Sequence, residues 1–243
     1  MRTVTAFVPA RAGSKRIPGK ALADLGGRPM IEYTLAAAYG AGLRIVVATD
    51  SEDVARYAHR RGAERYVDLS IYLRPESADD EPDISWVRAA LEAYPEVEDL
   101  AILRPTSPFR SSATVRWALA LWRTVGEDVD SARMVTPAPI HPGKTWRVIV
   151  VDSASSRLVP FVAERRDDGV PWHSSPTQSL PAAYVQTGGL ELIHRRTVEE
   201  LGSIAGVRVM PLIVDGLAAL DVNTPEDLER ARLVHASLEE VPL

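Results

Sequence analysis

Basic side chains gather in the first loop of the chain, residues 8–20. The chain has only three lysines against twenty-five arginines, and two of the three, Lys15 and Lys20, lie in this loop beside Arg11 and Arg16. An ammonium on a flexible stem binds phosphate as a compact point charge. A glycine between these cations lets the backbone approach an anion, and successive N–H groups can form a concavity around it. The loop therefore predicts a phosphate site.

This loop differs from the P-loop of ATPases and kinases. The P-loop has four residues between its first glycine and the sequence Gly-Lys-Ser/Thr. Here five residues separate Gly13 from Gly19, and Ala21 stands where the P-loop has its metal-binding hydroxyl. We therefore exclude a P-loop ATPase or kinase.

A second candidate set lies near the end of the chain, at Asp221 and Asn223. Side chains two positions apart in extended chain point to the same side, and their oxygens suit a hard cation such as Mg²⁺. Thr224 and Asp227 follow with the spacing of a capping box, which predicts a helix to about Glu239. The alternative is that these polar residues only shape the turn.

Strands and helices alternate through the first part of the chain. Strands are expected at 4–8, 43–50, 64–69 and 100–103, and helices from Met30, after Ser51 and over 84–94. Uninterrupted apolar strands indicate a parallel sheet covered on both faces, and ligands of such sheets bind beyond the carboxyl ends of the strands. Polar segments follow three strands, at 11–20, 49–50 and 104–110. We expect these segments to lie together.

Composition narrows the class of protein. A chain of 243 residues is long enough for a full core, and we expect one domain. No apolar run is long enough for a membrane span, and we expect no secretory segment and a cytoplasmic location. The absence of cysteine excludes disulfides and thiolate sites. The net charge of -5 argues against nucleic acid as a partner.

The regular alternation ends after Val135. Closely spaced prolines prevent a helix, a strand is expected over 147–151, and Lys144 stands alone on a loop, where a lysine is most often solvated. Further on, a strand is expected over 207–214. The acidic loop over 76–83 is also expected to be solvated, because its acids lack ligand spacing. The histidines show no zinc spacing and no Gly-x-Ser-x-Gly elbow is present, so hydrolases are excluded.

Four ordered segments resemble one family, the cytidylyltransferases that make CMP-activated acids, such as CMP-sialic acid and CMP-Kdo synthetases. Residues 10–20 match Ala-Arg-x-Gly-Ser-Lys-x-x-Pro-x-Lys, and residues 104–110 are similar to Gln-Pro-Thr-Ser-Pro-Leu-Arg. Residues 178–188 resemble Gln-x-Leu-Pro-x-x-Tyr-x-x-Asn-Gly, and residues 221–223 resemble Asp-x-Asp. The chain is identified on these segments as a member of the family.

The resemblance implies an α/β, Rossmann-like three-layer nucleotidyltransferase fold (GT-A-like) with a mostly parallel sheet. It also implies transfer of CMP from CTP with release of pyrophosphate, Mg²⁺ as cofactor, and a homodimer formed through an excursion at about 138–181. Catalytic roles fall on Arg11, Lys20 and Asp221. CTP binding falls on Arg11, Ala12, Gly13, Ser14, Lys15, Lys20 and Arg74, acceptor binding on Arg104, Lys144, Gln178 and Gln186, and metal binding on Asp221 and Asn223.

Departures from the family pattern leave the acceptor open. Arg104 replaces a glutamine, Thr177 an arginine, Thr187 an asparagine and Asn223 an aspartate. One hypothesis is a sialic-acid-like nonulosonic acid. Another is a small phosphonate such as phosphonoformate, because relatives of the family transfer CMP to phosphonates and an arginine can bind such an anion in bidentate fashion. A third, of another class, is a nucleotide-binding regulator without catalysis, suggested by Asn223.

Overall fold

The computed structural model describes residues 3–74, 82–152 and 155–239. The chain divides into two compact units, the first formed by Met1–Met134 with Thr187–Leu243 and the second by Val135–Gln186. All residues of the expected excursion, about 138–181, belong to the second unit. Residues 76–81 of the expected acidic loop lie outside the described residues.

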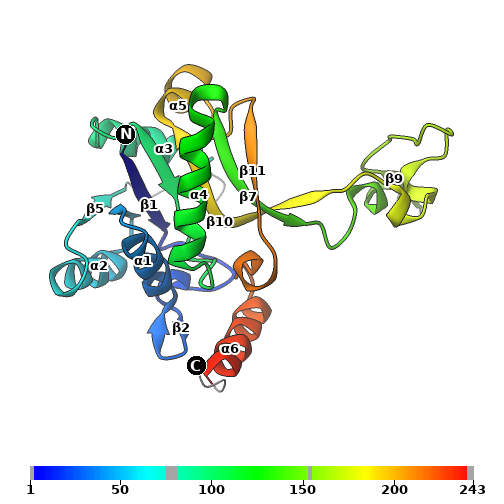
Figure 1. Cartoon of the computed structure of the whole chain (residues 1–243). Helices are drawn as coiled ribbons and strands as arrows, with labels where there is room; N and C mark the ends of the chain where they lie inside the picture. Colours follow the sequence, from blue (N-terminus) through cyan, green and yellow to red (C-terminus); the bar gives the residue numbers. More distant parts are fainter. Residues whose placement is uncertain (1–2, 75–81, 153–154, 240–243) are drawn as a thin grey trace. The chain divides into compact units, whose positions relative to one another are not determined.

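A seven-stranded sheet, ordered β11-β7-β10-β6-β1-β4-β5, forms the centre of the fold (Figure 1). β1 pairs in parallel with both β4 and β6, and β4 pairs in parallel with β5, whereas β10 runs antiparallel to β6. The expectation of a mixed α/β fold with a mostly parallel sheet is confirmed. The strands are β1 Val4–Ala10, β4 Arg44–Thr49, β5 Leu69–Leu73, β6 Asp99–Ile102, β7 Ser131–Pro137, β10 Tyr184–His194 and β11 Val209–Ile213.

Side chains of β1 alternate between two apolar cores, one on each face of the sheet. Ala6 and Val8 pack into the core that also contains Ile31, Leu35 and Val115, whereas Phe7 packs into the other. Helices α1, α2 and α4 thus cover one face, and α3 and α5 cover the opposite face. Burial on both faces is why these strands are continuously apolar. The helices are α1 Met30–Gly40, α2 Glu52–Glu64, α3 Asp83–Ala93, α4 Ser112–Val125 and α5 Arg195–Leu201.

Helix starts follow the capping residues. Ser51 Oγ accepts from Val54 N at 3.3 Å to begin α2. At the start of α6, Pro225–Glu239, the N–H of Asp227 donates to Thr224 Oγ1 at 3.2 Å and Thr224 N donates back to Asp227 Oδ2 at 2.8 Å. Backbone donors from Asn223 and Thr224 hold the pKa of Asp227 below its ordinary value, although burial opposes them. The expected capping box is confirmed.

The strand expected over 64–69 is wrong, because α2 continues to Glu64 and β5 begins only at Leu69. Of the apolar residues in this stretch, Tyr66 contacts α1, Val67 is exposed and Leu69 begins β5. Tyr66 is buried, and its phenol donates to Glu32 Oε1 at 2.8 Å. Arg61 forms an ion pair with Glu32 on α1. It also pairs at 2.8 Å with Glu64, three residues later on α2, and such a pair stabilises the last turn of the helix.

Short elements complete the first unit. A turn at Gly26 and Gly27 joins β2, Asp24–Leu25, to β3, Arg28–Pro29, with φ of 58° and 75° at the two glycines. The strand expected over 207–214 is β11, Val209–Ile213. Single-turn 3₁₀ helices are η1 Lys20–Leu22, η2 Gly126–Asp128 and η6 Gly216–Ala219.

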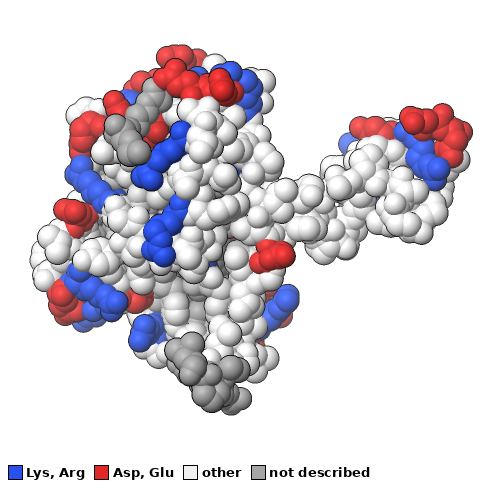
Figure 2. Space-filling model, in the orientation of Figure 1, with Lys and Arg blue, Asp and Glu red and all other residues white. Residues whose placement is uncertain are grey.

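The second unit is built around an antiparallel pair, β8 Trp146–Val150 and β9 Ser156–Pro160, which confirms the strand expected over 147–151. All five residues of β8 are exposed. Charged side chains gather at one end of the unit in Figure 2, and the rest of its visible surface is uncharged. Its 3₁₀ helices are η3 Pro142–Lys144, η4 Trp172–Ser174 and η5 Thr177–Ser179. No helix in the described part of the chain has the length and apolar character of a membrane span.

Candidate active site

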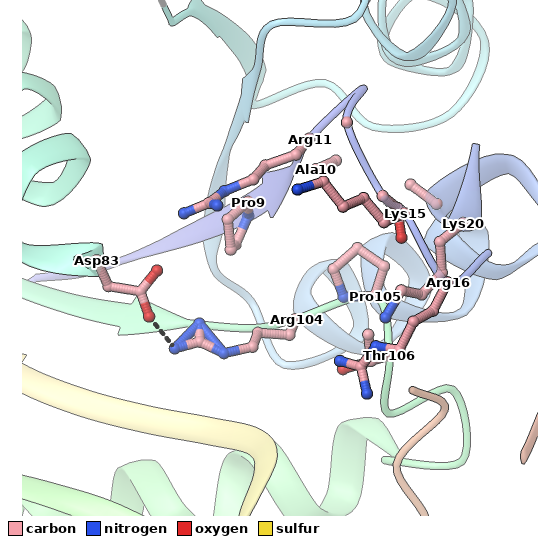
Figure 3. A pocket seen from close by; sticks show the side chains of 13 residues that line it. Pro9, Ala10, Arg11, Lys15, Arg16, Lys20, Asp83, Arg104, Pro105 and Thr106 are labelled. Atoms are coloured by element: carbon pink, nitrogen blue, oxygen red, sulfur yellow. Dashed lines mark hydrogen bonds and ion pairs between the residues drawn. The ribbon is translucent and has the colours of Figure 1, made fainter. Parts of the chain in front are cut away.

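A cavity of about 480 Å³ lies at the carboxyl ends of β1 and β6 (Figure 3). The loop after β1 and the segment after β6 therefore meet, as the topology predicted. The lining residues are Pro9, Ala10, Arg11, Gly13, Ser14, Lys15, Arg16, Lys20, Ala21, Asp83, Arg104, Pro105 and Thr106.

Cations dominate one side of this cavity. In Figure 3 the side chains of Lys15, Arg16 and Lys20 lie together there, whereas Arg104 meets Asp83 on the other side. The loop reaches Lys20 through Gly19, whose φ of 61° is a left-handed conformation that favours glycine. Several positive charges in one concavity suit a polyphosphate.

Lys20 links the loop to the turn near the end of the chain. Its Nζ donates to Val222 O at 3.3 Å and to Asn223 Oδ1 at 3.4 Å. Burial lowers the pKa of Lys20, and the nearby charge of Arg16 lowers it further, while Asp221 and Asp227 oppose the shift. The ammonium is therefore partly desolvated, which strengthens its interaction with an anion.

Asp221 lies against Gly188 and the segment after β6. Its Oδ2 accepts from Asn223 Nδ2 at 2.7 Å, and its Oδ1 is 3.5 Å from Ser107 Oγ. A Cβ at Gly188 would lie 3.1 and 3.2 Å from the two carboxylate oxygens and 3.1 Å from Thr106 Oγ1. A side chain at this position would therefore press on the carboxylate, whereas glycine leaves it in place.

These oxygens fit a magnesium ion that also contacts substrate. Among the described residues no group of three or more His, Cys, Asp or Glu side chains gathers as a metal cage. Mg²⁺ typically uses one or two protein carboxylates and completes its shell with phosphate oxygens and water. Asp221, with the hydroxyls of Thr106 and Ser107 beside it, matches that pattern. Asn223 presents its amide nitrogen to Asp221 and its oxygen to Lys20.

Arg104 is held by two carboxylates. Its Nη2 is 2.8 Å from Asp83 Oδ2 and 2.6 Å from Glu191 Oε1, and Arg133 pairs with the other oxygen of Glu191 at 3.0 Å. Trp86 Nε1 donates to Asp83 Oδ1 at 2.8 Å, which fixes that carboxylate. Glu191 is only 1% exposed. The two arginines and the two acids of this network balance, and Arg11, whose side chain lies on the same side of the cavity in Figure 3, is a further cation there.

Arg110 is a buried cation behind the site. It donates to the carbonyl of Gly189 and, at 3.1 Å, to Thr34 Oγ1, and its Nη1 lies 3.5 Å from Arg104 O. Burial lowers its pKa, and the charge of Asp221 opposes the shift. These bonds tie the segment after β6 to α1 and to the part of β10 that packs on Asp221.

The structure brings most of the expected residues of the first unit together. Arg11, Gly13, Ser14, Lys15, Lys20 and Arg104 line the cavity. Ala12, Arg74, Asp221 and Asn223 are not among the lining residues. Ala12 donates its N–H to Asp50, and Arg74 is buried with its guanidinium 5.3 Å from the centre of the Trp86 ring.

Lys144, Gln178 and Gln186 belong to the second unit, which is described by itself. Lys144 Nζ donates to His173 O at 3.0 Å and to Ser175 O, so it ties two segments of that unit together. Gln178 and Gln186 are exposed. Their acceptor-binding role stays a prediction.

Sequence reasoning assigned no role to Asp83, Thr106 or Asp50, although each lies at the cavity or its loop. Thr106 belongs to a recognised segment, so a role for it could have been sought. Asp83 belongs to an acidic stretch that gave no reason to single it out. Only the fold places it beside Arg104.

A mostly parallel α/β sheet with a basic loop at the carboxyl edge is typical of nucleotide-binding transferases. The family description "Cytidylyltransferase" matches residues 5–108. A CMP-N,N'-diacetyllegionaminic acid synthase of Legionella pneumophila is 30% identical over 92% of this chain and 92% of its own length. The chain belongs to the cytidylyltransferase family, and it is a nucleotidyltransferase.

Another relative is also named as a cytidylyltransferase, and a solved structure has a similar fold. A 3-deoxy-manno-octulosonate cytidylyltransferase of Mesorhizobium japonicum is 29% identical over 94% of this chain and 97% of its own length. The solved structure of a CMP:2-keto-3-deoxy-manno-octonic acid synthetase complexed with CTP covers 97% of this chain and 99% of its own, with a TM-score of 0.66 and 18% identity. At that identity the likeness concerns the fold.

Proposed function

We propose that this enzyme transfers CMP from CTP to a sialic-acid-like nonulosonic acid and releases pyrophosphate. CTP-dependent cytidylyl transfer follows from the family. The observation that carries the site assignment is the meeting of the basic loop with the Asp221 turn, through the bonds of Lys20. Lys20, which lines the cavity, thereby connects the group of cations to the turn of Asp221 and Asn223, which do not line it.

The reaction is an in-line attack of an acceptor oxygen on the α-phosphorus of CTP. Such transfers depend on positioning and on neutralising charge more than on covalent chemistry by the protein. In this proposal Lys15 and Lys20 hold the triphosphate and Arg11 contacts it from the other side of the loop. Lys20 then neutralises charge that develops on the leaving pyrophosphate.

Asp221 would hold Mg²⁺, with Asn223 as a second oxygen donor after rotation of its amide. When bound, Mg²⁺ neutralises phosphate charge and orients the phosphoryl oxygens. The hydroxyls of Ser107 and Thr106 near Asp221 support this assignment.

The charge balance around Arg104 favours a sugar acid as acceptor. Asp83 and Glu191 already neutralise Arg104 and Arg133. A phosphonate dianion carries more negative charge on a smaller molecule than a sugar acid, which has one carboxylate and many hydroxyls that bond to both guanidinium and carboxylate groups. The similarity to a legionaminic acid enzyme supports the same class.

We further propose a homodimer formed through the second unit. Val148, Val150, Leu158 and Phe161 are 66%, 73%, 59% and 63% exposed. A two-stranded ribbon is marginally stable by itself, and exposed apolar patches of this kind mark interfaces. A second copy of the chain would cover these side chains.

The acceptor is tested by pyrophosphate release with CTP and Mg²⁺ against nonulosonic acids, 3-deoxy-manno-octulosonate and small phosphonates. We expect the highest kcat/KM with a nonulosonic acid. Preference for the octulosonate would show that the acceptor is a different sugar acid. Release with phosphonates alone would overturn the proposed acceptor class.

A further inference from the structure

Asp50 contacts the phosphate-site loop directly. Its Oδ1 accepts a hydrogen bond of 2.6 Å from the backbone N–H of Ala12, thirty-eight residues earlier in the chain. Ser14 N in turn donates to Ala12 O at 3.0 Å, so both backbone groups of Ala12 are held. The bond fixes the loop between Arg11 and Gly13, both of which line the cavity.

Thr49 secures the residue before the loop. Its hydroxyl donates to Ala10 O at 2.6 Å and accepts from Ser51 N at 3.0 Å, and its side chain is fully buried. Its carbonyl accepts from Arg74 N at 2.8 Å. The end of β4 therefore holds the chain on both sides of Arg11, because Thr49 bonds to Ala10 and Asp50 bonds to Ala12.

The charge of Asp50 is unfavourable for a polyanion site. Among the described residues no lysine or arginine pairs with it, so its negative charge is not balanced by an ion pair. A carboxylate beside a triphosphate repels it. Its short bond to Ala12 gives the only role visible in the described contacts, which is to shape the loop before the nucleotide arrives.

We infer that Asp50 is a positioning residue for CTP, which sets the backbone of residues 11–13 for the triphosphate. The inference rests on the proposed function. Because Asp50 acts on the phosphates and not on the nucleoside, its removal weakens CTP binding and spares cytidine binding. General damage to the fold would weaken both.

The test compares Asp50→Ala, Asp50→Asn and Asp50→Glu with wild type. Binding of CTP and of cytidine is measured by calorimetry, and kcat and KM by pyrophosphate release. We expect Asp50→Ala to lower kcat/KM for CTP at least about thirtyfold, with cytidine affinity unchanged within about threefold. Asp50→Asn keeps an acceptor oxygen and stays within about fivefold of wild type.

Asp53→Asn is the matched control, because Asp53 is exposed in the first turn of α2 and pairs with Arg56. It should leave all constants unchanged. If Asp50→Ala does not fold, Asp50→Glu decides, since it keeps the charge, displaces the carboxylate and should lose CTP selectively. Equal losses for CTP and cytidine, or an Asp50→Asn variant as impaired as Asp50→Ala, would overturn the inference. A wild-type enzyme without CTP turnover would instead contradict the proposed function.

Discussion

Lys20 Nζ lies 3.4 Å from Asn223 Oδ1, so two side chains 203 positions apart join the first loop to the last turn before α6. This contact places a partly desolvated ammonium next to the proposed metal residue. We expect Lys20→Ala to cost at least ~2 kcal/mol of transition-state stabilisation, about thirtyfold in kcat/KM. Steady-state kinetics with CTP check this. Arg232→Ala on α6 is the control, and Lys20→Ala activity within twofold of wild type would show that the triphosphate lies elsewhere.

Asn223 offers a test of the metal site by gain of function. Asn223→Asp adds a second carboxylate beside Asp221, so we expect the Mg²⁺ concentration at half-maximal activity to fall about threefold or more. Asp221→Asn should lower kcat at least about a hundredfold, without recovery at high Mg²⁺. Titrations of activity with Mg²⁺ measure both effects. An unchanged Mg²⁺ dependence in both variants would argue against a metal at this turn.

Gly188 is predicted to tolerate no side chain. Gly188→Ala would place a Cβ 3.1 Å from Asp221 Oδ1 and from Thr106 Oγ1, so one of them must move. We expect kcat to fall at least about tenfold, because small displacements at a phosphoryl-transfer site are costly.

Gly62→Ala on α2 is its control, since the added Cβ would meet Leu69 at an ordinary 3.6 Å. Alanine in a helix interior should stabilise the protein by about 0.5–1 kcal/mol and leave kcat unchanged. A Gly188→Ala enzyme with full activity would show that Asp221 has room to shift.

Glu32 links α1 to α2 through bonds from Arg61, Tyr57 at 2.8 Å and Tyr66 at 2.8 Å. Burial opposes its ionisation, but bonds from Arg61, Tyr66 and Tyr57 outweigh burial and hold its pKa below the ordinary 4.5. Glu32→Gln should therefore lower the free energy of unfolding by about 2–4 kcal/mol at neutral pH.

The lowered pKa of Glu32 also determines how the destabilisation by Glu32→Gln depends on pH. A carboxylate with a depressed folded-state pKa stabilises the protein above its unfolded pKa, and this stabilisation is lost as pH falls through the folded value. The difference between wild type and Glu32→Gln should shrink below pH 4.5, which urea unfolding at several pH values measures. Glu64→Gln removes only the exposed partner of Arg61 and should cost less than about 1 kcal/mol. Equal losses for the two variants would contradict the assignment.

Much of the fold and part of the site follow from the sequence. Continuous apolar strands indicated a covered parallel sheet, and Ser51 and Thr224 marked helix starts because capping is a local interaction. The strand expected over 64–69 failed because α2 continues to Glu64 and Tyr66, in the connection to β5, contacts Glu32 on α1. Tertiary contacts of this kind leave no local periodicity.

In the site, too, some features could be predicted from the sequence and others depend on the fold. Arg11, Lys15 and Lys20 were found from residue type and spacing, and they line the cavity. Arg104 was expected to grip an anionic acceptor, but its neutralisation depends on Asp83 and Glu191, which lie 21 and 87 positions away in sequence. Only the pairing of β6 with β10 brings Glu191 to it. Charge balance in a cavity is thus a property of the fold.

The most direct test of cytidylyl transfer is pyrophosphate release by the purified enzyme from CTP, UTP, ATP and GTP, each with Mg²⁺ and a nonulosonic acid. Mass spectrometry of the product identifies the transferred group. We predict release with CTP that depends on the acceptor, together with a CMP-sugar product. Release with another nucleotide in preference to CTP, or no CMP adduct with any sugar acid, would contradict the proposed reaction.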